Sequence, residues 1–399
     1  MKKQAAFFYS FSDKNAGDFS LNIAAIDILL DAGFSVLVVS RFSERDEEFI
    51  STSHYLENRS PGNVKVVPSP FRLDRSAGYF IKIRDYISSF LVLIGWIKAS
   101  YVKEIIMQSD VVVMCGGNIL RSSSLADSIR LIALNYPLRL ARKLGREYII
   151  FPQSSAEIKG LGGVVLGGML RKANTVFVRE KLSFDKLEYK YKEANLVQSL
   201  DLAFFLMDER FFKPNNKVAS IALTIRGDTL GGLSKISAEE ASVVERVFID
   251  TVAGLKDVAK FTIMVQGTEA DLILSRRVRD KVSYETGVYI DIVEEHDTFK
   301  LIELYSSFDL LIGMRLHSII LAAISGTPSY GIFKKDWGLK NPGIMAQLEL
   351  PYGYIEDYVG LDLDAVKGIM SGKTVFQAKI RDLVYRNRGI LDERLKSFL

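Results

Sequence analysis

Arg315 and His317 are the two residues of this sequence whose types and spacing most clearly predict chemistry. An apolar run, 309–312, leads into Gly313, and an apolar helical stretch from 316 to 325 follows. Charged side chains are costly in apolar surroundings unless they are paired. The start of a helix favours anions, because its backbone N–H groups point outwards there. The pattern therefore predicts an anion site, in preference to a histidine buried in the core.

Arg226 ends a second strand-like run, 222–225, and is followed by Gly227. Open parallel α/β sheets bind ligands at the carboxyl ends of their strands. The planar fork of arginine suits a carboxylate or a phosphate. We therefore expect Arg226 and Arg315 to serve the same small anion from two different loops.

Three turns in the first half of the chain are candidates for a second ligand. Asn15, Gly17 and Asp18 follow the first apolar run, although Asp18 could equally cap a helix. The pair Gly116-Gly117, followed by Asn118, comes directly after the run 110–114. Glycines there permit positive φ and close approach of a ligand, or simply a tight turn from strand to helix.

Gln153 and Ser154 follow another apolar run and could bind a sugar, or could belong to a capping cluster. Arg179 also follows a strand-like run. We expect it to form an ion pair with Glu180 or Asp201 and to have no further role.

The order of elements predicts a parallel α/β sheet in the first half of the chain. Apolar runs without period-2 alternation are typical of strands buried on both faces, and helical patterns separate many of them. The expected strands are 5–9, 35–39, 64–67, 110–114, 148–151 and 175–178, and the expected helices are 19–31, 79–108, 125–144 and 160–172.

The same alternation then restarts in a second half. Strands are expected at 218–225, 261–265, 288–292 and 310–312, with helices at 238–259, 269–282, 298–306 and 316–325. The Pro-Asn-Asn sequence within 211–217 indicates a linker. We predict domains at 1–210 and 211–375, and a charged helix at 376–399 that could cross back to the first domain.

Composition excludes several classes of protein. The 52 basic and 48 acidic residues nearly balance, which argues against a nucleic-acid partner. The single cysteine excludes disulfides within the chain, and the three histidines stand far apart, so no metal site is expected. The apolar segment 89–100 is too short to span a bilayer and predicts a buried helix, or one that docks on a membrane surface.

At these residues the sequence resembles the polysaccharide pyruvyl transferase family, from Asn15 to about Pro328. The strongest part is the segment from Gly313 to His317 with its apolar helix. Supporting parts are the turns at 15–18 and 116–117, the segment 178–183, Asp201 with Phe204, and Arg226. Three turns depart from the family. The first turn, 12–18, has fewer glycines than usual, Cys115 and Asn118 flank only two glycines, and the usual glycine is absent from 152–155.

The resemblance implies two Rossmann-like domains facing across a cleft, as in the GT-B glycosyltransferases. It implies phosphoenolpyruvate as co-substrate, no cofactor, and a pyruvate ketal on a sugar as product. Gly313, Arg226, Arg315 and His317 would bind the donor, and His317, Arg315 and Asp18 would be catalytic. The residues on the acceptor side would be Asn15, Gly17, Asp18, Gly116, Gly117, Asn118, Gln153 and Ser154.

Two other functions remain open on the sequence. One is a GT-B glycosyltransferase with a nucleotide-sugar donor, for which Glu294, Glu295 or Asp297 could bind the ribose. The other is a non-catalytic member of a polysaccharide pathway. The apolar run after the first residues is too short for a signal peptide, so we expect a cytoplasmic protein that could meet a lipid-linked saccharide at the inner face of the membrane.

Overall fold

The computed structural model describes residues 2–69, 80, 83–84, 87, 90–91, 100–122, 125–228 and 236–398. Residue contacts divide the chain into two compact units. The first comprises Met1–Lys14, Asp18–Phe205 and Asn387–Leu399, and the second comprises Asn15–Gly17 and Leu206–Arg386. The domain limits inferred from the sequence, after residues 210 and 375, stay predictions.

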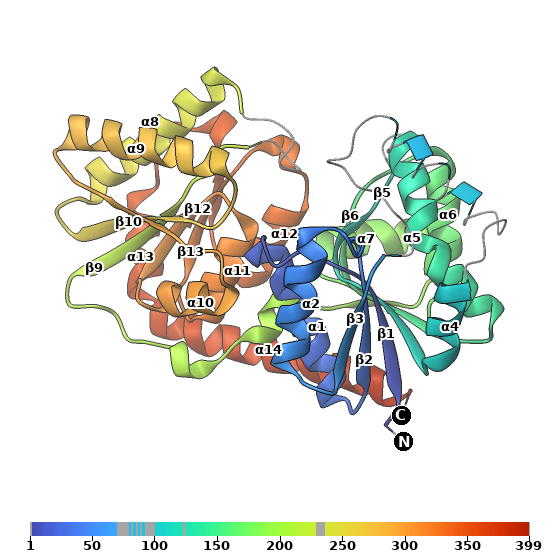
Figure 1. Ribbon diagram of the computed structural model, residues 1–399. Coiled ribbons are helices and arrows are strands. Elements are labelled where there is room, and N and C mark those ends of the chain that lie inside the picture. The colour runs from blue at the N-terminus through green and yellow to red at the C-terminus, as the bar shows by residue number, and fades with distance from the viewer. Residues whose placement is uncertain are drawn as a thin grey trace. The chain divides into compact units, whose positions relative to one another are not determined.

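The first unit contains a parallel sheet of the Rossmann-like kind (Figure 1). Its strand order is β3-β2-β1-β4-β6-β7-β8, and β5 pairs with β6. Every pairing in it is parallel. The strands are β1 Gln4–Ser10, β2 Ser35–Ser40, β3 Val64–Val67, β4 Val111–Met114, β5 Gly117–Ser122, β6 Tyr148–Ile158, β7 Thr175–Val178 and β8 Leu196–Gln198.

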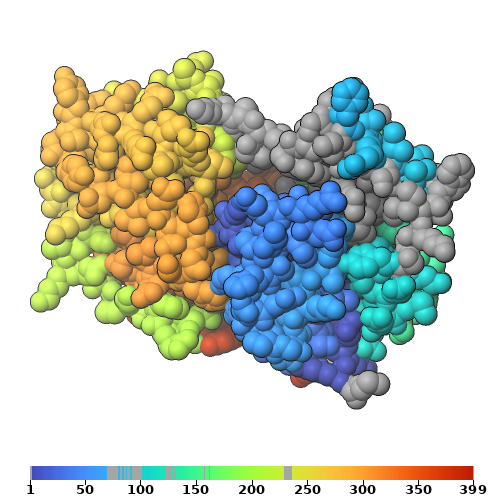
Figure 2. Space-filling model, in the orientation of Figure 1, coloured from blue at the N-terminus to red at the C-terminus, as the bar shows by residue number. Residues whose placement is uncertain are grey.

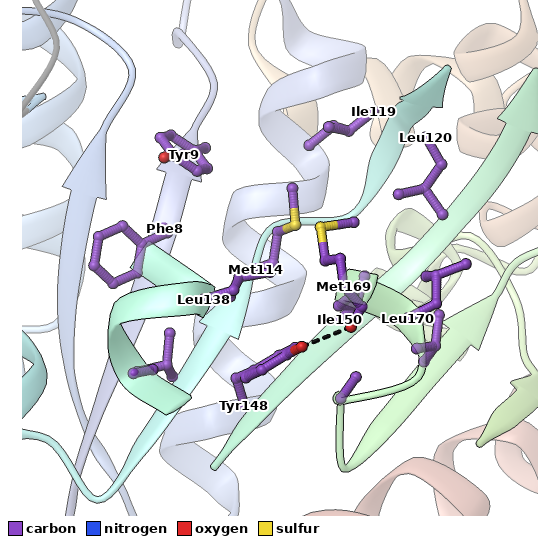
Figure 3. Packing of buried hydrophobic residues seen from close by; sticks show 14 of the residues in the cluster. Phe8, Tyr9, Met114, Ile119, Leu120, Leu138, Tyr148, Ile150, Met169 and Leu170 are labelled. Carbon is purple, nitrogen blue, oxygen red and sulfur yellow. Dashed lines mark hydrogen bonds between the residues drawn. The ribbon is translucent and has the colours of Figure 1, made fainter. Parts of the chain in front are cut away.

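The centre of this sheet is fully covered. All four residues of β4 are buried, as are Ala5 to Ser10 of β1. Figure 3 shows part of the resulting core, in which Met114 of β4 and Met169 of α6 lie close to Ile150. The hydroxyl of Tyr148 in that view is satisfied, because it donates to the carbonyl of Met169 at 2.6 Å.

The helices of the first unit largely follow the sequence pattern. They are α1 Ala16–Asp31, α2 Glu47–Arg59, α4 Ser100–Gln108, α5 Leu125–Lys143, α6 Gly160–Leu170 and α7 Lys181–Lys190. Helix α2 was not predicted. It buries only Thr52 and Leu56, so its sequence has no apolar stripe from which a helix could be predicted. The helix is part of the blue surface in Figure 2.

The predicted helix 79–108 is described mainly through α4, and most of the apolar segment 89–100 lies outside the described residues. Within the part of the chain that the structure describes, no helix is long and apolar enough to cross a membrane.

The second unit contains a second parallel sheet, with the order β11-β10-β9-β12-β13-β14 (Figure 1). The strands are β9 Ala219–Thr224, β10 Ala259–Val265, β11 Asp291–Glu294, β12 Leu310–Gly313, β13 Ser329–Phe333 and β14 Tyr352–Tyr354. Strand β9 is central, and the chain adds β10 and β11 on one side and β12 to β14 on the other. Its order therefore reverses between β9 and β12, which is where such sheets bind ligands.

Helices and short 3-10 turns connect these strands. They are α8 Ala238–Leu255, α9 Glu269–Thr286, α10 Thr298–Ser306, α11 Leu316–Ile324, η3 Lys335–Trp337, α12 Lys340–Leu348, η4 Ile355–Asp357, α13 Leu363–Ser371 and α14 Lys373–Lys396. Helices α8 and α9 pack side by side, and α10 packs against α11. Several starts are capped by side chains, such as Ser237 on Glu240 N at 3.1 Å.

A buried cluster fixes the start of the second unit. The carboxylate of Asp309 accepts the backbone N–H of Asn216 at 3.0 Å and that of Ser220 at 2.9 Å. Lys373 Nζ lies 3.5 Å from Asp309 and donates to the carbonyl of Phe308 at 2.7 Å. Burial lowers the pKa of Lys373, although the Asp309 carboxylate opposes the shift. The cluster anchors the linker predicted at 211–217 to β12 and α14.

Candidate functional site

The carboxyl ends of β9, β10 and β12 bring together the charged residues of the second unit. Arg226 follows β9, Gly267 follows β10, and Arg315 follows β12 as the N-cap residue just before α11. The helix predicted after Arg315 is therefore confirmed. The arrangement lies at the reversal in strand order.

Arg226 and Arg315 converge on one carboxylate, that of Asp228. Arg226 Nε donates to Oδ1 at 2.8 Å, and Arg315 Nη2 lies 3.0 Å from Oδ2. Thr268 Oγ1 donates to the same Oδ2 at 3.2 Å. Burial alone would raise the pKa of Asp228, but Arg315 and Arg226 outweigh it and hold the pKa below its usual value. Because both arginines contact one carboxylate, a single small anionic ligand could contact both of them in the same way.

Asp271 is the second carboxylate of the cluster and joins its three loops. It lies 2.5 Å from Arg315 Nη2, and it accepts the backbone N–H of Gly227 at 2.8 Å and that of Thr268 at 3.3 Å. Burial opposes the charge of Arg315, but Asp271 and Asp228 outweigh it and raise the pKa of Arg315. Asp271 thus holds Arg315 charged and in place.

Gly267 is required by this close packing. A Cβ at position 267 would lie 2.0 Å from Asp271 Oδ2 and 2.7 Å from Arg315 Cζ. Any side chain there would separate the ion pair. Gly313, predicted to bind the donor, ends β12, and a Cβ there would lie 2.4 Å from Thr224 Oγ1.

Arg226 has an aromatic partner as well. Its guanidinium carbon lies 4.6 Å from the centre of the Trp337 ring, a cation–π distance. Burial, with a contribution from the charge of Arg315, lowers the pKa of Arg226. The ring therefore orients a guanidinium group that is already largely removed from water.

His317 stands in the first turn of α11 and is half-buried. Asn15 and Gly17 are grouped with this second unit, where Thr298 Oγ1 donates to the carbonyl of Ala16 at 3.0 Å. A Cβ on Gly17 would lie 2.5 Å from His317 Cβ, so only glycine permits this approach. Asp18 is grouped with the first unit, in the first turn of α1.

Three residues predicted on the acceptor side, Gly116, Gly117 and Gln153, shape a loop of the first unit. Gln153 is buried, donates to the carbonyl of Cys115 and accepts from Ile119 N at 3.1 Å. A Cβ at Gly116 would lie 2.6 Å from Leu202 Cδ1, and Gly117 has a φ of +123°. The glycine pair leads into strand β5 and not into a helix, so the alternative of a tight turn from strand to helix is wrong.

Ser154 accepts a hydrogen bond from Arg179 Nε at 2.6 Å. Arg179 also forms a fully buried ion pair with Asp201, which confirms the ion pair predicted for it. The side chain of Asn118 lies outside the described residues. A role in acceptor binding for Asn118, Gln153 and Ser154 stays a prediction.

Sequence reasoning missed Asp228, Asp271, Thr268 and Trp337. Asp228 stands two residues after Arg226, which the sequence did single out. Asp271 stands three residues after Thr268, in a pattern typical of a helix start. Neither pattern indicates an arginine partner from another loop. Within the described residues, no cluster of three or more His, Cys, Asp or Glu side chains could hold a metal ion.

The family model for polysaccharide pyruvyl transferases matches residues 15–332. The chain belongs to this family. The match includes Arg226, Asp228, Asp271, Arg315 and His317. No curated protein sequence matches the chain significantly.

Solved structures show the fold of this pyruvyl transferase family member to be that of the GT-B glycosyltransferases. The Anabaena protein HepE, solved with UDP and glucose, is 12% identical with a TM-score of 0.57, covering 99% of this chain and 100% of its own. An OtsA structure without ligand is 10% identical with a TM-score of 0.59, covering 99% of both chains. MurG from Acinetobacter baumannii is 11% identical with a TM-score of 0.53, again covering 99% of both. The predicted Rossmann-like α/β class is confirmed.

Proposed function

We propose that this protein transfers the pyruvyl group of phosphoenolpyruvate to hydroxyls of a saccharide, forming a pyruvate ketal. Family membership supports the class of reaction. The observation that carries the proposal for the donor is the convergence of Arg226 and Arg315 on the two oxygens of the Asp228 carboxylate. A carboxylate of the same size is one of the two anionic groups of phosphoenolpyruvate.

In the proposed mechanism, the donor carboxylate replaces Asp228 between the two guanidinium groups. Arginine pairs with a carboxylate in a fixed planar geometry, which would orient the enol carbon for attack. Nε of Arg315 is buried and has no hydrogen-bond partner among the residues that the structure describes. The donor phosphate would lie towards the start of α11, where helix N–H groups favour an anion.

The chemistry needs one proton on the methylene carbon and two hydroxyls on C2. We propose that His317 delivers the proton, because an imidazole titrates near neutral pH. The first hydroxyl adds to C2 and loses its proton, and inorganic phosphate leaves with the C2–O bond electrons. The second hydroxyl then adds and loses its proton, which completes the ketal. Asp18 is the candidate base on the acceptor side.

We further propose a cell-envelope or exopolysaccharide glycan as acceptor, bound by Asn15, Gly17, Asp18, Gly116, Gly117, Asn118, Gln153 and Ser154. A lipid-linked acceptor would bring the protein to the inner face of the membrane as a peripheral partner. The family name supports a polysaccharide acceptor.

The nucleotide-sugar alternative has less support in the second unit. Of its candidate ribose ligands, Asp297 caps α10 by accepting from Phe299 N and Lys300 N at 3.0 and 2.9 Å. Glu295 accepts from two backbone N–H groups, at 2.8 and 2.9 Å. Both carboxylates thus stabilise the turn before α10.

The test is phosphate release from phosphoenolpyruvate with a panel of saccharide acceptors, together with thermal shift on adding phosphoenolpyruvate or UDP-glucose. Arg315→Lys should lose most turnover, because an ammonium group lacks the planar fork. Arg276→Lys, on the exposed side of α9, is the control and should be unaffected. Stabilisation by UDP-glucose but not by phosphoenolpyruvate would reject the proposal, as would normal turnover of Arg315→Lys.

A further inference from the structure

A cavity of about 320 Å³ lies at the edge of the second sheet, beside strand β14. It shares no residue with the arginine cluster, because its walls come from β13, β14 and the segment that follows β14. Tyrosines supply much of its wall. The residues on which the argument depends are Tyr330, Tyr352, Gly353, Tyr354, Asp357 and Tyr358.

The cavity exists because a glycine stands where a strand would normally place a side chain. Ile332 of β13 is in register with Gly353 of β14, and residues in register in a parallel sheet point to the same face. Tyr330 shares that face of β13. A Cβ added at Gly353 would meet nothing closer than Tyr330 Oη, at 3.5 Å. Space for a ligand therefore opens above Gly353.

Two phenol groups face this space in a neutral form. Tyr358 Oη lies 3.4 Å from Asp250 Oδ2 of α8, and burial, with Asp250, raises the pKa of Tyr358 to about 12. Burial also raises the pKa of Tyr330, with Asp362 contributing. A neutral phenol can both donate and accept a hydrogen bond, as hydroxyl-rich ligands require.

The rim carries one held carboxylate. Tyr352 and Tyr354 alternate with Gly353 along β14 and therefore point to the opposite face of the strand, where their rings lie edge to face with centres 5.7 Å apart. Asp357 forms an ion pair with Lys335 at 2.5 Å, and Lys335 Nζ also lies 5.9 Å from the centre of the Tyr354 ring. These contacts limit the conformations open to Asp357.

We propose that this cavity binds one saccharide unit. Aromatic rings pack against the C–H faces of a pyranose, while phenols and a carboxylate bind its hydroxyls. A carboxylate at the rim disfavours an anionic ligand, and the polar groups disfavour a purely aliphatic one. The volume falls at the lower end of the range for small-molecule sites, about 300–1,000 Å³. The site goes beyond the proposed reaction, because none of its residues belongs to the donor cluster.

The experiment uses the full chain and neutral tetrasaccharides of glucose, galactose and mannose, with saturation-transfer-difference NMR and calorimetry. At least one should bind, and Gly353→Val should weaken that binding tenfold or more because its side chain fills the cavity. Tyr330→Phe should weaken it severalfold, because Tyr330 Oη is the group that faces the space above Gly353. Tyr284→Ala removes a 92% exposed tyrosine elsewhere in the unit and should have no effect.

Three results would overturn the site. They are failure of every tetrasaccharide to bind, unchanged binding by a folded Gly353→Val, and equal loss in Tyr284→Ala. If Gly353→Val does not fold, Tyr330→Phe decides, and unchanged affinity in that variant would reject the proposal. Thermal shift by phosphoenolpyruvate on the same samples reports separately on the proposed donor reaction.

Discussion

At the scale of single residues, Asp228 determines how available the two arginines are. It pairs with both Arg226 and Arg315, so the cluster without ligand already contains an anion. With Asp271 included, two carboxylates balance two guanidinium groups. An anionic donor must therefore compete with a carboxylate of the protein itself, which lowers its apparent affinity.

We expect Asp228→Asn to bind phosphoenolpyruvate about three- to tenfold more tightly, a gain of up to about 1.4 kcal/mol. The amide keeps the shape of the side chain but does not compete as an anion. Calorimetric titration of the inactive pair Asp228→Asn/His317→Ala against His317→Ala measures this without turnover. Asp280→Asn, an exposed carboxylate on α9, is the control. Weaker binding would mean that Asp228 positions the arginines instead.

The pH dependence of stability tests the same ion pairs. A carboxylate with a depressed pKa stabilises the fold above its unfolded value, about 3.9, and this contribution is lost as the pH falls through the lower folded value. Asp228→Asn should therefore be less stable than the wild type at pH 7. The difference in urea unfolding free energy should shrink towards zero as the pH falls through the lowered folded pKa of Asp228. A difference that does not change with pH would contradict the ion pairing.

His317 is expected to act in catalysis and not in stability. It is half-buried at the start of α11, so His317→Ala leaves no large cavity in the core. His317→Ala should lower kcat by about 100-fold or more, as for loss of a general acid. His317→Gln should keep donor affinity but not turnover. Normal kcat in the glutamine variant, measured by phosphate release, would assign His317 a structural role.

At the scale of elements, periodicity and apolar runs located most central strands. Runs such as 110–114 and 310–312 are buried on both faces, and burial of this kind is visible in sequence. Edge and irregular elements were missed for a physical reason. β14 has three residues and partly exposed side chains, so it has no apolar run. β6 continues to Ile158 through polar residues, where its partner β5 supplies the backbone hydrogen bonds.

Sequence patterns likewise predicted only part of the candidate site. Arg226 and Arg315 were found because charge after an apolar strand is unusual. Asp271 was not, because a carboxylate in the first turn of a helix is common and has a local explanation. Its contacts with Gly227 N and Arg315 arise only when three loops meet at one sheet edge.

We expect Asp271→Asn to destabilise the loops around the arginines. The amide keeps one acceptor oxygen, but Arg315 loses a buried charge partner, which in such pairs costs about 3–5 kcal/mol at most. Asn should lower the unfolding free energy and raise the KM for phosphoenolpyruvate. The matched control is Asp291→Asn, an exposed residue of β11 in the same unit. An unchanged KM would show that Arg315 does not depend on Asp271.

At the scale of the whole molecule, α14 contributes to both compact units. Its first part belongs to the second unit, and residues 387–399 are grouped with the first. Leu391 and Leu395 near its end are fully buried, and Lys3 Nζ donates to the carbonyl of Phe398 at 2.8 Å. The last turns of the chain are therefore part of the core that the first residues help to form.

We predict that Leu391→Ala destabilises the protein by about 2–4 kcal/mol, as expected for a buried leucine. Ile390→Ala changes the adjacent, 36% exposed residue and should cost less than about 1 kcal/mol. Denaturant unfolding followed by circular dichroism measures both. Equal effects of the two variants would show that the end of α14 is not packed in a core.

Cys115 determines how the protein reacts with thiol reagents. It is the only cysteine, it is fully buried, and burial raises its pKa to about 12. The thiolate that alkylating reagents attack is therefore scarce and shielded at neutral pH. The native chain should therefore react only slowly with maleimides. A cysteine introduced at an exposed position, such as Tyr284→Cys, would be its one fast-reacting thiol, and a single label could be attached there without first removing Cys115.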